Sequence, residues 1–120
     1  MNRWVLLEHK IHSKNLIDVH YDFLIEDKLD CHTWKLHKIP KPNNGFVEII
    51  KQPNHRLVWL SRLEYELSEN RGFVKRLDYG SFSNILNKQH SQKLKIVLNG
   101  TLLNGLLTIN GNFCHLTKKN

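Results

Sequence analysis

The feature that most constrains the fold of this chain is a period-two alternation of apolar and polar residues, interrupted by turn-forming dipeptides. The clearest case is Val19–Glu26, in which apolar residues alternate with His20, Asp22 and Leu24. Successive side chains of a strand point to opposite faces, so His20, Asp22 and Leu24 are predicted to share one face. Hairpin turns are predicted at Asn99-Gly100, Asn104-Gly105 and Asn110-Gly111.

The same pattern predicts short strands along nearly the whole chain. One begins near Arg3, and the others are Cys31–Lys38, Phe46–Lys51, Arg56–Leu60, Gly72–Asp78 (ended by Tyr79-Gly80), Lys93–Leu98, Thr101–Leu103, Leu106–Ile109 and Asn112–Leu116. One short helix is predicted at Ser81–Gln89, where Phe82, Ile85 and Leu86 form an apolar stripe. We therefore expect an all-β fold with one or two short helices, a small closed or partly closed barrel of about eight strands.

Composition narrows the class of protein. The 120 residues are expected to form a single domain, and 40% hydrophobic with 24% charged residues is typical of a soluble globular chain. We expect no membrane span, no secretory signal and no disulfide framework from the two cysteines, which favours the cytoplasm. The net charge of +7 and the pI near 9.6 are typical of a small domain that binds a polyanion, most often nucleic acid. A merely solvated basic surface explains them as well, and charge alone does not decide between the two.

The strongest candidate for chemistry is His20-x-Asp22. An imidazole and a carboxylate two residues apart on a strand can converge on one divalent cation. His9, at the end of the first predicted strand, could supply a third ligand, and His12 competes for this position. Two imidazoles and one carboxylate suit Mn, Fe or Zn. Judged by spacing alone, His20 and Asp22 are better explained as part of a polar outer face that binds no metal.

Basic segments supply candidate phosphate contacts. His55-Arg56 could contact a phosphate oxygen, and the histidine could protonate a leaving oxygen. The Gly-flanked Asn70-Arg71-Gly72, followed by Lys75-Arg76, could cradle a phosphate or follow a nucleic-acid backbone. An ordinary surface loop explains the first segment more simply, and a strand edge guarded by cations explains the second equally well.

Six segments of the chain occur in an order that has a counterpart in a known family. They are Val5–His9, Val19–Glu26, Thr33-Trp34 leading to Pro40, His55–Leu60, Arg71–Gly80 and Leu94–Gly105. Together they resemble the 3′-phosphoesterase domain of bacterial DNA ligase D and its stand-alone relatives in bacteria and archaea. The most specific match is Val19–Glu26, which is very close to the family's Leu-His-Tyr-Asp-Phe-Arg-Leu-Glu. The likeness runs over most of the chain, roughly from Arg3 to Leu116.

The resemblance implies a compact β-barrel flanked by short helices and a manganese-dependent enzyme. Such enzymes remove a 3′-terminal ribonucleotide and then a 3′-phosphate during DNA repair. By resemblance His9, His20 and Asp22 hold the metal, which is Mn²⁺ or another divalent transition metal such as Zn²⁺. The expected partners are DNA or RNA–DNA 3′-ends and a separately encoded ligase or polymerase.

The resemblance also suggests roles around the metal. Asp22 and His55 are the expected catalytic residues, with His55 touching the phosphate or protonating the leaving oxygen. From the basic segments themselves, and not from the resemblance, Arg56, Arg71 and Arg76 are the expected phosphate and nucleic-acid contacts, with Lys75 as a further candidate.

Three positions depart from the family pattern. The arginine that grips the phosphate is replaced by Leu24, a polar residue two before the first histidine by Leu7, and a tyrosine by Trp59. Loss of a bidentate arginine commonly costs several kcal/mol of transition-state stabilisation. The alternative to an active enzyme is therefore a catalytically weak or inactive relative that binds nucleic-acid ends or a repair partner. A weaker third hypothesis is a barrel acting on a small phosphorylated molecule.

Overall fold

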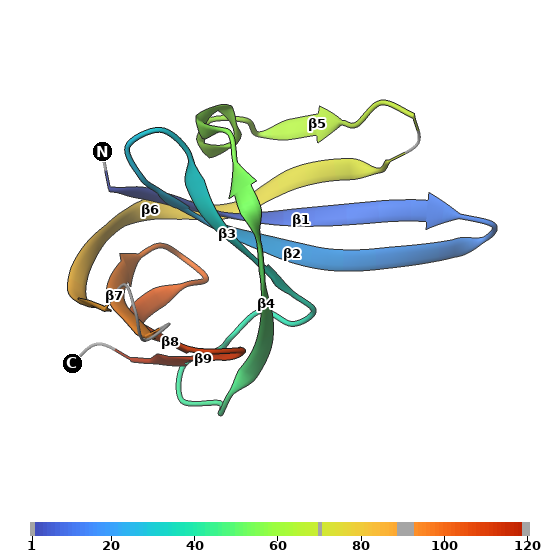
Figure 1. The fold of residues 1–120 in the computed structure, drawn as a ribbon. Coiled ribbons are helices and arrows are strands. Elements are labelled where there is room, and N and C mark those ends of the chain that lie inside the picture. The colour runs from blue at the N-terminus through green and yellow to red at the C-terminus, as the bar shows by residue number, and fades with distance from the viewer. Residues whose placement is uncertain (1, 70, 89–92, 119–120) are drawn as a thin grey trace.

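The alternating segments form one antiparallel sheet that curls into a barrel (Figure 1). The computed structural model describes residues 2–69, 71–88 and 93–118. Within them the strands are β1 (Arg3–Ser13), β2 (Leu16–Glu26), β3 (Cys31–Leu36), β4 (Val47–His55), β5 (Glu64–Glu66), β6 (Phe73–Lys88), β7 (Lys93–Asn99), β8 (Asn104–Asn110) and β9 (Phe113–Thr117). The helical element of the described residues is the 3-10 helix η1 (Leu57–Leu60).

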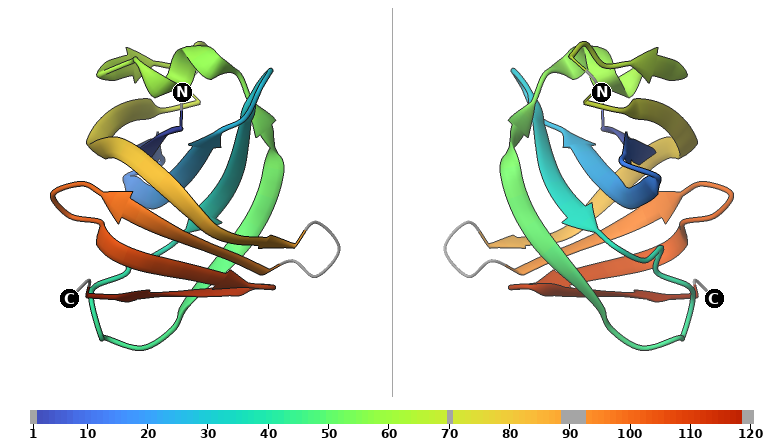
Figure 2. Two further views of the ribbon diagram at one scale, coloured as in Figure 1. Left: turned by 90° about the vertical axis from the view of Figure 1, so that its left-hand side faces the viewer. Right: turned by 90° about the vertical axis from the view of Figure 1, so that its right-hand side faces the viewer.

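Eight of these strands form a ring, and the way it closes explains its shape. The order is β1-β2-β3-β4-β9-β8-β7-β6, and pairing of β6 with β1 completes the circle, while β5 adds to β6. Strand β6 can serve several neighbours because it is long: Phe73–Ser81 pairs with β1 and Ser81–Lys88 with β7. By contrast, β4 and β9 pair only through Val47 and Glu48. The expected partly closed barrel of about eight strands is confirmed (Figure 2).

Two apolar clusters lie on opposite faces of the β1–β2 hairpin. The barrel core takes Trp4, Leu6, Phe23 and Ile25 from these strands, together with apolar residues of β3, β4 and β7–β9. The other face packs beneath the segment that contains η1. We call this second set the outer cluster; it comprises Val5, Leu7, Leu24, Cys31, Leu60 and Val74, with Leu57, Trp59 and Leu67 against them. One strand pair therefore supports two cores, and the polar residues of its outer face lie beside the smaller one.

A buried carboxylate organises the turn between β7 and β8. Asp78 is 3% exposed and accepts hydrogen bonds from the backbone N–H groups of Tyr79, Thr101, Leu102 and Leu103 at 2.8–3.0 Å. The strand predicted at Thr101–Leu103 is therefore wrong, because these amides bond a side chain instead of a neighbouring strand. The turn predicted at Asn104-Gly105 is wrong for a related reason, since both residues already belong to β8.

The helix predicted at Ser81–Gln89 is also wrong. Residues 81–88 continue β6 and pair with β7, and Gln89 lies outside the described residues. The register shifts between Asn84 and Leu86, so one extra residue interrupts the alternation there. One extra residue in a strand changes the spacing of its apolar residues from two to three at that point. A spacing of three is also typical of a helix, which explains the wrong prediction.

The opposite error occurs at Arg56–Leu60, which was predicted to be a strand. After Arg56 the chain makes the 3-10 turn of η1, with Trp59 N–H donating to the Arg56 carbonyl and Ser61 N–H to the Val58 carbonyl. The predicted end of a strand at Tyr79-Gly80 is likewise wrong, because β6 runs on to Lys88. In the part of the chain described here, no helix has the length and apolar character needed to cross a membrane.

Candidate metal centre

A two-residue turn sets the geometry of the candidate site. Lys14 and Asn15 join β1 to β2 with φ of 45° and 68°, and Ser13 pairs with Leu16. Two successive residues of positive φ are the signature of a type I′ hairpin, whose short loop fixes the register of the strands. Counting back along that register places His9 directly opposite His20. The turn thereby brings together two imidazoles that are eleven residues apart in the sequence.

The side chains of His9, His20 and Asp22 converge, and we call them the metal triad. His9 Nδ1 lies 3.2 Å from His20 Nε2, and His20 Nε2 lies 3.5 Å from Asp22 Oδ1. One ligand atom from each residue falls within 4.8 Å of the other two. Donors held about 2.1 Å from a transition-metal ion are separated by about 3.0–3.4 Å at octahedral or tetrahedral angles. The two separations from His20 Nε2 are close to this range, and the third lies within 4.8 Å.

A backbone carbonyl selects the tautomer of His9. Its Nε2–H donates to the Arg71 carbonyl at 2.8 Å, so the Nδ1 lone pair faces His20. A ring nitrogen that bonds a carbonyl in this way commonly orients a metal-ligating histidine. Gly72 lets the carbonyl come this near: its φ is +108°, and a Cβ there would lie 3.0 Å from His9 Nε2 and meet the Lys10 carbonyl. Sequence reasoning treated Arg71-Gly72 as a phosphate cradle and missed this role.

The second histidine is buried and favours its neutral form. His20 is 8% exposed, and burial, together with His9 and Lys35, lowers the pKa of its imidazole against the opposing effect of Asp22. With His9 Nδ1 acting as acceptor, neutral His20 donates from Nε2 and leaves Nδ1 as a bare lone pair. Consistent with this, His20 Nδ1 is buried and has no partner among the described residues. Coordination through Nε2 would therefore be coupled to displacement of its proton.

These observations test whether the residues present fit a metal. Two imidazole nitrogens and one carboxylate, of which His9 is partly exposed, form an incomplete donor set that leaves positions for water and substrate. The hydrogen bond from His9 Nε2–H to the Arg71 carbonyl holds the His9 ring in place. The triad therefore fits a divalent transition ion, and its ligand types suit Mn²⁺, Fe²⁺ and Zn²⁺ alike.

The competing ligand His12 lies elsewhere. It is three residues beyond His9, on the opposite face of β1, and is exposed near the hairpin tip, where it pairs with Ile17. In Figure 1 this end of the hairpin extends beyond the barrel. The structure thus brings His9, and not His12, to His20 and Asp22.

The structure does not bring His55 into the triad. It pairs with Cys31, which pairs with Glu26, four residues beyond Asp22 and so about 13 Å further along the strand direction. Its Nδ1–H donates to the Pro53 carbonyl at 3.0 Å. Arg56, the next residue, is exposed.

The other predicted cations are engaged near the site without pointing at it. The Arg71 guanidinium donates to the carbonyl and hydroxyl of Ser68 at 3.1 and 3.0 Å. Arg76 pairs with Leu7 in the register and stacks on the Tyr79 ring at 4.0 Å. The cation that sequence reasoning missed is Lys35, which lies opposite Asp22 on β3. The alternation around Trp34 was the available signal, since it places Lys35 on the outer face.

The three departures from the family pattern meet in one place. Leu24, Leu7 and Trp59 all belong to the outer cluster, where the two leucines are 0% and 2% exposed. Their neighbour Leu60 comes from η1, and Val74 from β6. The packing next to the triad along β1 and β2 is consequently apolar where the family pattern has polar groups.

No protein-family model matches the chain, and no curated protein matches it significantly. The resemblance to the 3′-phosphoesterase family therefore rests on the ordered sequence segments and on the metal triad.

Proposed function

We propose that this protein is a metal-dependent phosphoesterase that acts on nucleic-acid 3′-ends during DNA repair, in the cytoplasm. The observation that carries the proposal is the convergence of His9, His20 and Asp22, with the His20 imidazole 3.2 Å from one partner and 3.5 Å from the other. The net charge of +7 supports a polyanionic substrate. The substrates proposed are DNA or RNA–DNA ends that carry a 3′-phosphate or a 3′-terminal ribonucleotide.

In this proposal each residue has a distinct task. His9, His20 and Asp22 would hold Mn²⁺ or a similar divalent ion, and the Arg71 carbonyl would keep the His9 ring in its ligating tautomer. A bound divalent ion supplies Lewis-acid polarisation of a phosphate and a water of lowered pKa. Lys35, opposite Asp22, would attract the phosphate to the open side of the triad. Since His55 is held near Pro53, its proposed contact would be with a more distant part of the substrate.

A second candidate function is favoured by the outer cluster. Because Leu24, Leu7 and Trp59 place apolar groups beside the triad, the strongest phosphate contact of the family pattern is missing. A weak or inactive relative that binds 3′-ends, or a separately encoded ligase or polymerase, would tolerate this arrangement. Salt-sensitive binding of ends without turnover would favour this second function.

The deciding experiment is a 3′-end-processing assay on labelled primer-templates, with and without Mn²⁺. We expect Mn²⁺-stimulated loss of the 3′-phosphate or ribonucleotide, abolished in Asp22→Ala. Asp18→Ala is the matched control, because Asp18 is an exposed acid on the same face of β2. If the pure protein with saturating Mn²⁺ leaves these ends intact, the enzymatic proposal fails.

Lys35→Met tests the proposed phosphate contact within the same assay. We expect the Michaelis constant for the nucleic acid to rise about tenfold, since a charge-assisted hydrogen bond would be lost. Lys38→Met, an exposed lysine beyond the end of β3, is the control for net charge. Equal kinetics for the two variants would exclude a specific role for Lys35.

A further inference from the structure

A second recess lies inside the barrel, on the face of the sheet opposite to the metal triad. Its volume is about 810 Å³, within the range of small-molecule sites. Lys51 of β4 and Asn112, just before β9, both line it, and the two strands pair with each other only at Val47 and Glu48. We call this recess the barrel mouth. Figure 2 shows the strands that surround the barrel from two sides.

The barrel mouth has an apolar floor and a polar rim. Ile25 and Ile109, which are 5% and 3% exposed, form the floor, and Ile96, which also lines the recess, is fully buried. Trp34 and Phe82 add aromatic walls. The rim carries amides and charged groups, among them Asn84 and Asn112. A pocket of this kind suits a ligand with an apolar ring and a polar group.

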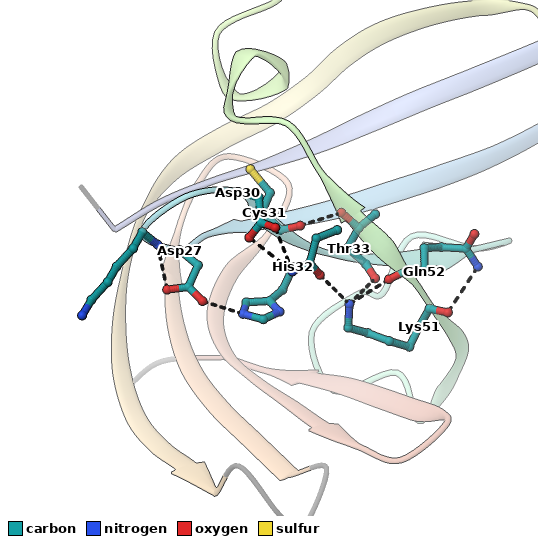
Figure 3. A network of polar contacts seen from close by, with 9 residues as sticks. Asp27, Asp30, Cys31, His32, Thr33, Lys51 and Gln52 are labelled. Carbon is teal, nitrogen blue, oxygen red and sulfur yellow. Dashed lines mark hydrogen bonds and ion pairs between the residues drawn. The ribbon is translucent and has the colours of Figure 1, made fainter.

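The acidic groups of the rim already have cationic or hydrogen-bonding partners. Glu26 accepts hydrogen bonds from the Arg3 guanidinium at 3.1 and 2.8 Å. The Asp27 carboxylate lies 2.8 Å from His32 Nε2, as Figure 3 shows. These contacts reduce the negative potential that the two carboxylates present to a ligand.

Lys51 is placed differently. Its ammonium donates to the carbonyls of Gln52 and Thr33 at 2.8 and 3.3 Å and to Asn54 Oδ1 at 3.3 Å, all neutral oxygens (Figure 3). The same group lies 5.1 Å from the centre of the Trp34 ring. Burial lowers the pKa of Lys51, and Asp30 only partly opposes this effect. Lys51 is an exposed residue, and an ammonium that contacts neutral oxygens gains a charge-assisted hydrogen bond from an anionic ligand.

We propose that the barrel mouth binds a small aromatic anion, with its ring on the floor formed by Ile25 and Ile109 and its acidic group at Lys51. Lys93, which also lines the mouth, adds a second positive charge to the entrance. This binding does not depend on the metal triad, because the triad lies on the other face of the sheet.

Two fluorescent probes that differ in one group provide the test. Anilinonaphthalene sulfonate carries an anion on its ring system, and phenylnaphthylamine has the same rings without it. We expect both probes to brighten with the native protein, and the sulfonate to bind about tenfold more tightly, as one charge-assisted contact would provide. Lys51→Met should remove that preference and leave phenylnaphthylamine binding unchanged.

Two further variants complete the test. Asn84→Trp places a bulky ring on the exposed rim and should weaken both probes, whereas Asp22→Ala should weaken neither. Circular dichroism and thermal melting would establish that each variant is folded. The proposal is overturned if the sulfonate shows no preference in the native protein, or if a folded Lys51→Met variant keeps it. Equal probe binding in Asn84→Trp would also overturn the location, whatever the outcome of the 3′-end assay.

Discussion

Replacing Gly72 with alanine should weaken metal binding without unfolding the protein. A Cβ at this position would lie 3.0 Å from His9 Nε2 and 3.0 Å from Ile11 Cγ1, and would also meet the Lys10 carbonyl. Carbon contacts are comfortable only from about 3.5 Å, so β6 and β1 would have to separate by about 0.5 Å or more. The 2.8 Å bond from His9 Nε2–H to the Arg71 carbonyl would then stretch or break.

The size of the effect follows from the role of that bond. Loss of the hydrogen-bond partner that orients a metal-ligating histidine typically costs about 10- to 100-fold in metal affinity. This range corresponds to about 1.4–2.7 kcal/mol of binding free energy. The φ of +108° adds backbone strain, which would lower the free energy of unfolding by about 1–3 kcal/mol.

Titration calorimetry with Mn²⁺ and with Zn²⁺, on metal-free protein, would measure the affinity. Gly45→Ala is the matched control, because Gly45 has a φ of +80° but nothing within 4 Å of its Cβ position. Both variants should lose stability in urea, and only Gly72→Ala should lose metal affinity. If both bind the ion as the native protein does, the proposed orientation of His9 is wrong. If the native protein itself binds neither ion, the metal centre is refuted.

Three further predictions concern stability. Leu24→Ala should lower the free energy of unfolding by about 2–5 kcal/mol in urea melts, because Leu24 is 0% exposed in the outer cluster; a loss below 1 kcal/mol would contradict this packing. Asp78→Asn should cost roughly 2–6 kcal/mol, since two of the four backbone donors would face an amide N–H₂; an unchanged thermal midpoint would argue against the role of Asp78. Arg3 lowers the pKa of Glu26 from 4.5 to about 2, so stability from this pair is complete above pH 4.5 and lost as the pH falls toward 2. In denaturant melts, the free energy of unfolding should depend less on pH across this interval for Glu26→Gln than for the native protein. Identical pH profiles for the two proteins would exclude a contribution of the Arg3–Glu26 pair.

The fold class could be predicted because alternation is a local signal. The pattern in Val19–Glu26 gave the correct faces: Phe23 and Ile25 enter the barrel core, and His20 and Asp22 face the other way. One error occurred where pairing with the next strand overrides the local spacing of apolar residues. Residues 81–88 form a strand because β7 pairs with them around a bulge. The local sequence of this segment carries no signal for that pairing.

The candidate site was predictable to the same extent. The spacing of His20 and Asp22 was sufficient to place both on one face, but the choice between His9 and His12 depended on the turn. Lys14-Asn15 has a positive φ at both residues, although it is not one of the usual Asn-Gly or Asp-Gly pairs. The position of His55 depended on the irregular register between β3 and β4, for which the sequence carries no local signal.

The narrow contact between β4 and β9 has a consequence for the dynamics of the barrel. Apart from Val47 and Glu48, a hydrogen bond from Ile49 N–H to the Asn112 carbonyl joins this part of the sheet. Local opening is cheapest where few backbone bonds must break, so the amide hydrogens of residues 50–52, 54 and 55 should exchange with deuterium sooner than those shared by β1, β2 and β6. A molecule filling the lumen would slow this exchange, whereas an ion on the far side of the sheet would leave it unaltered.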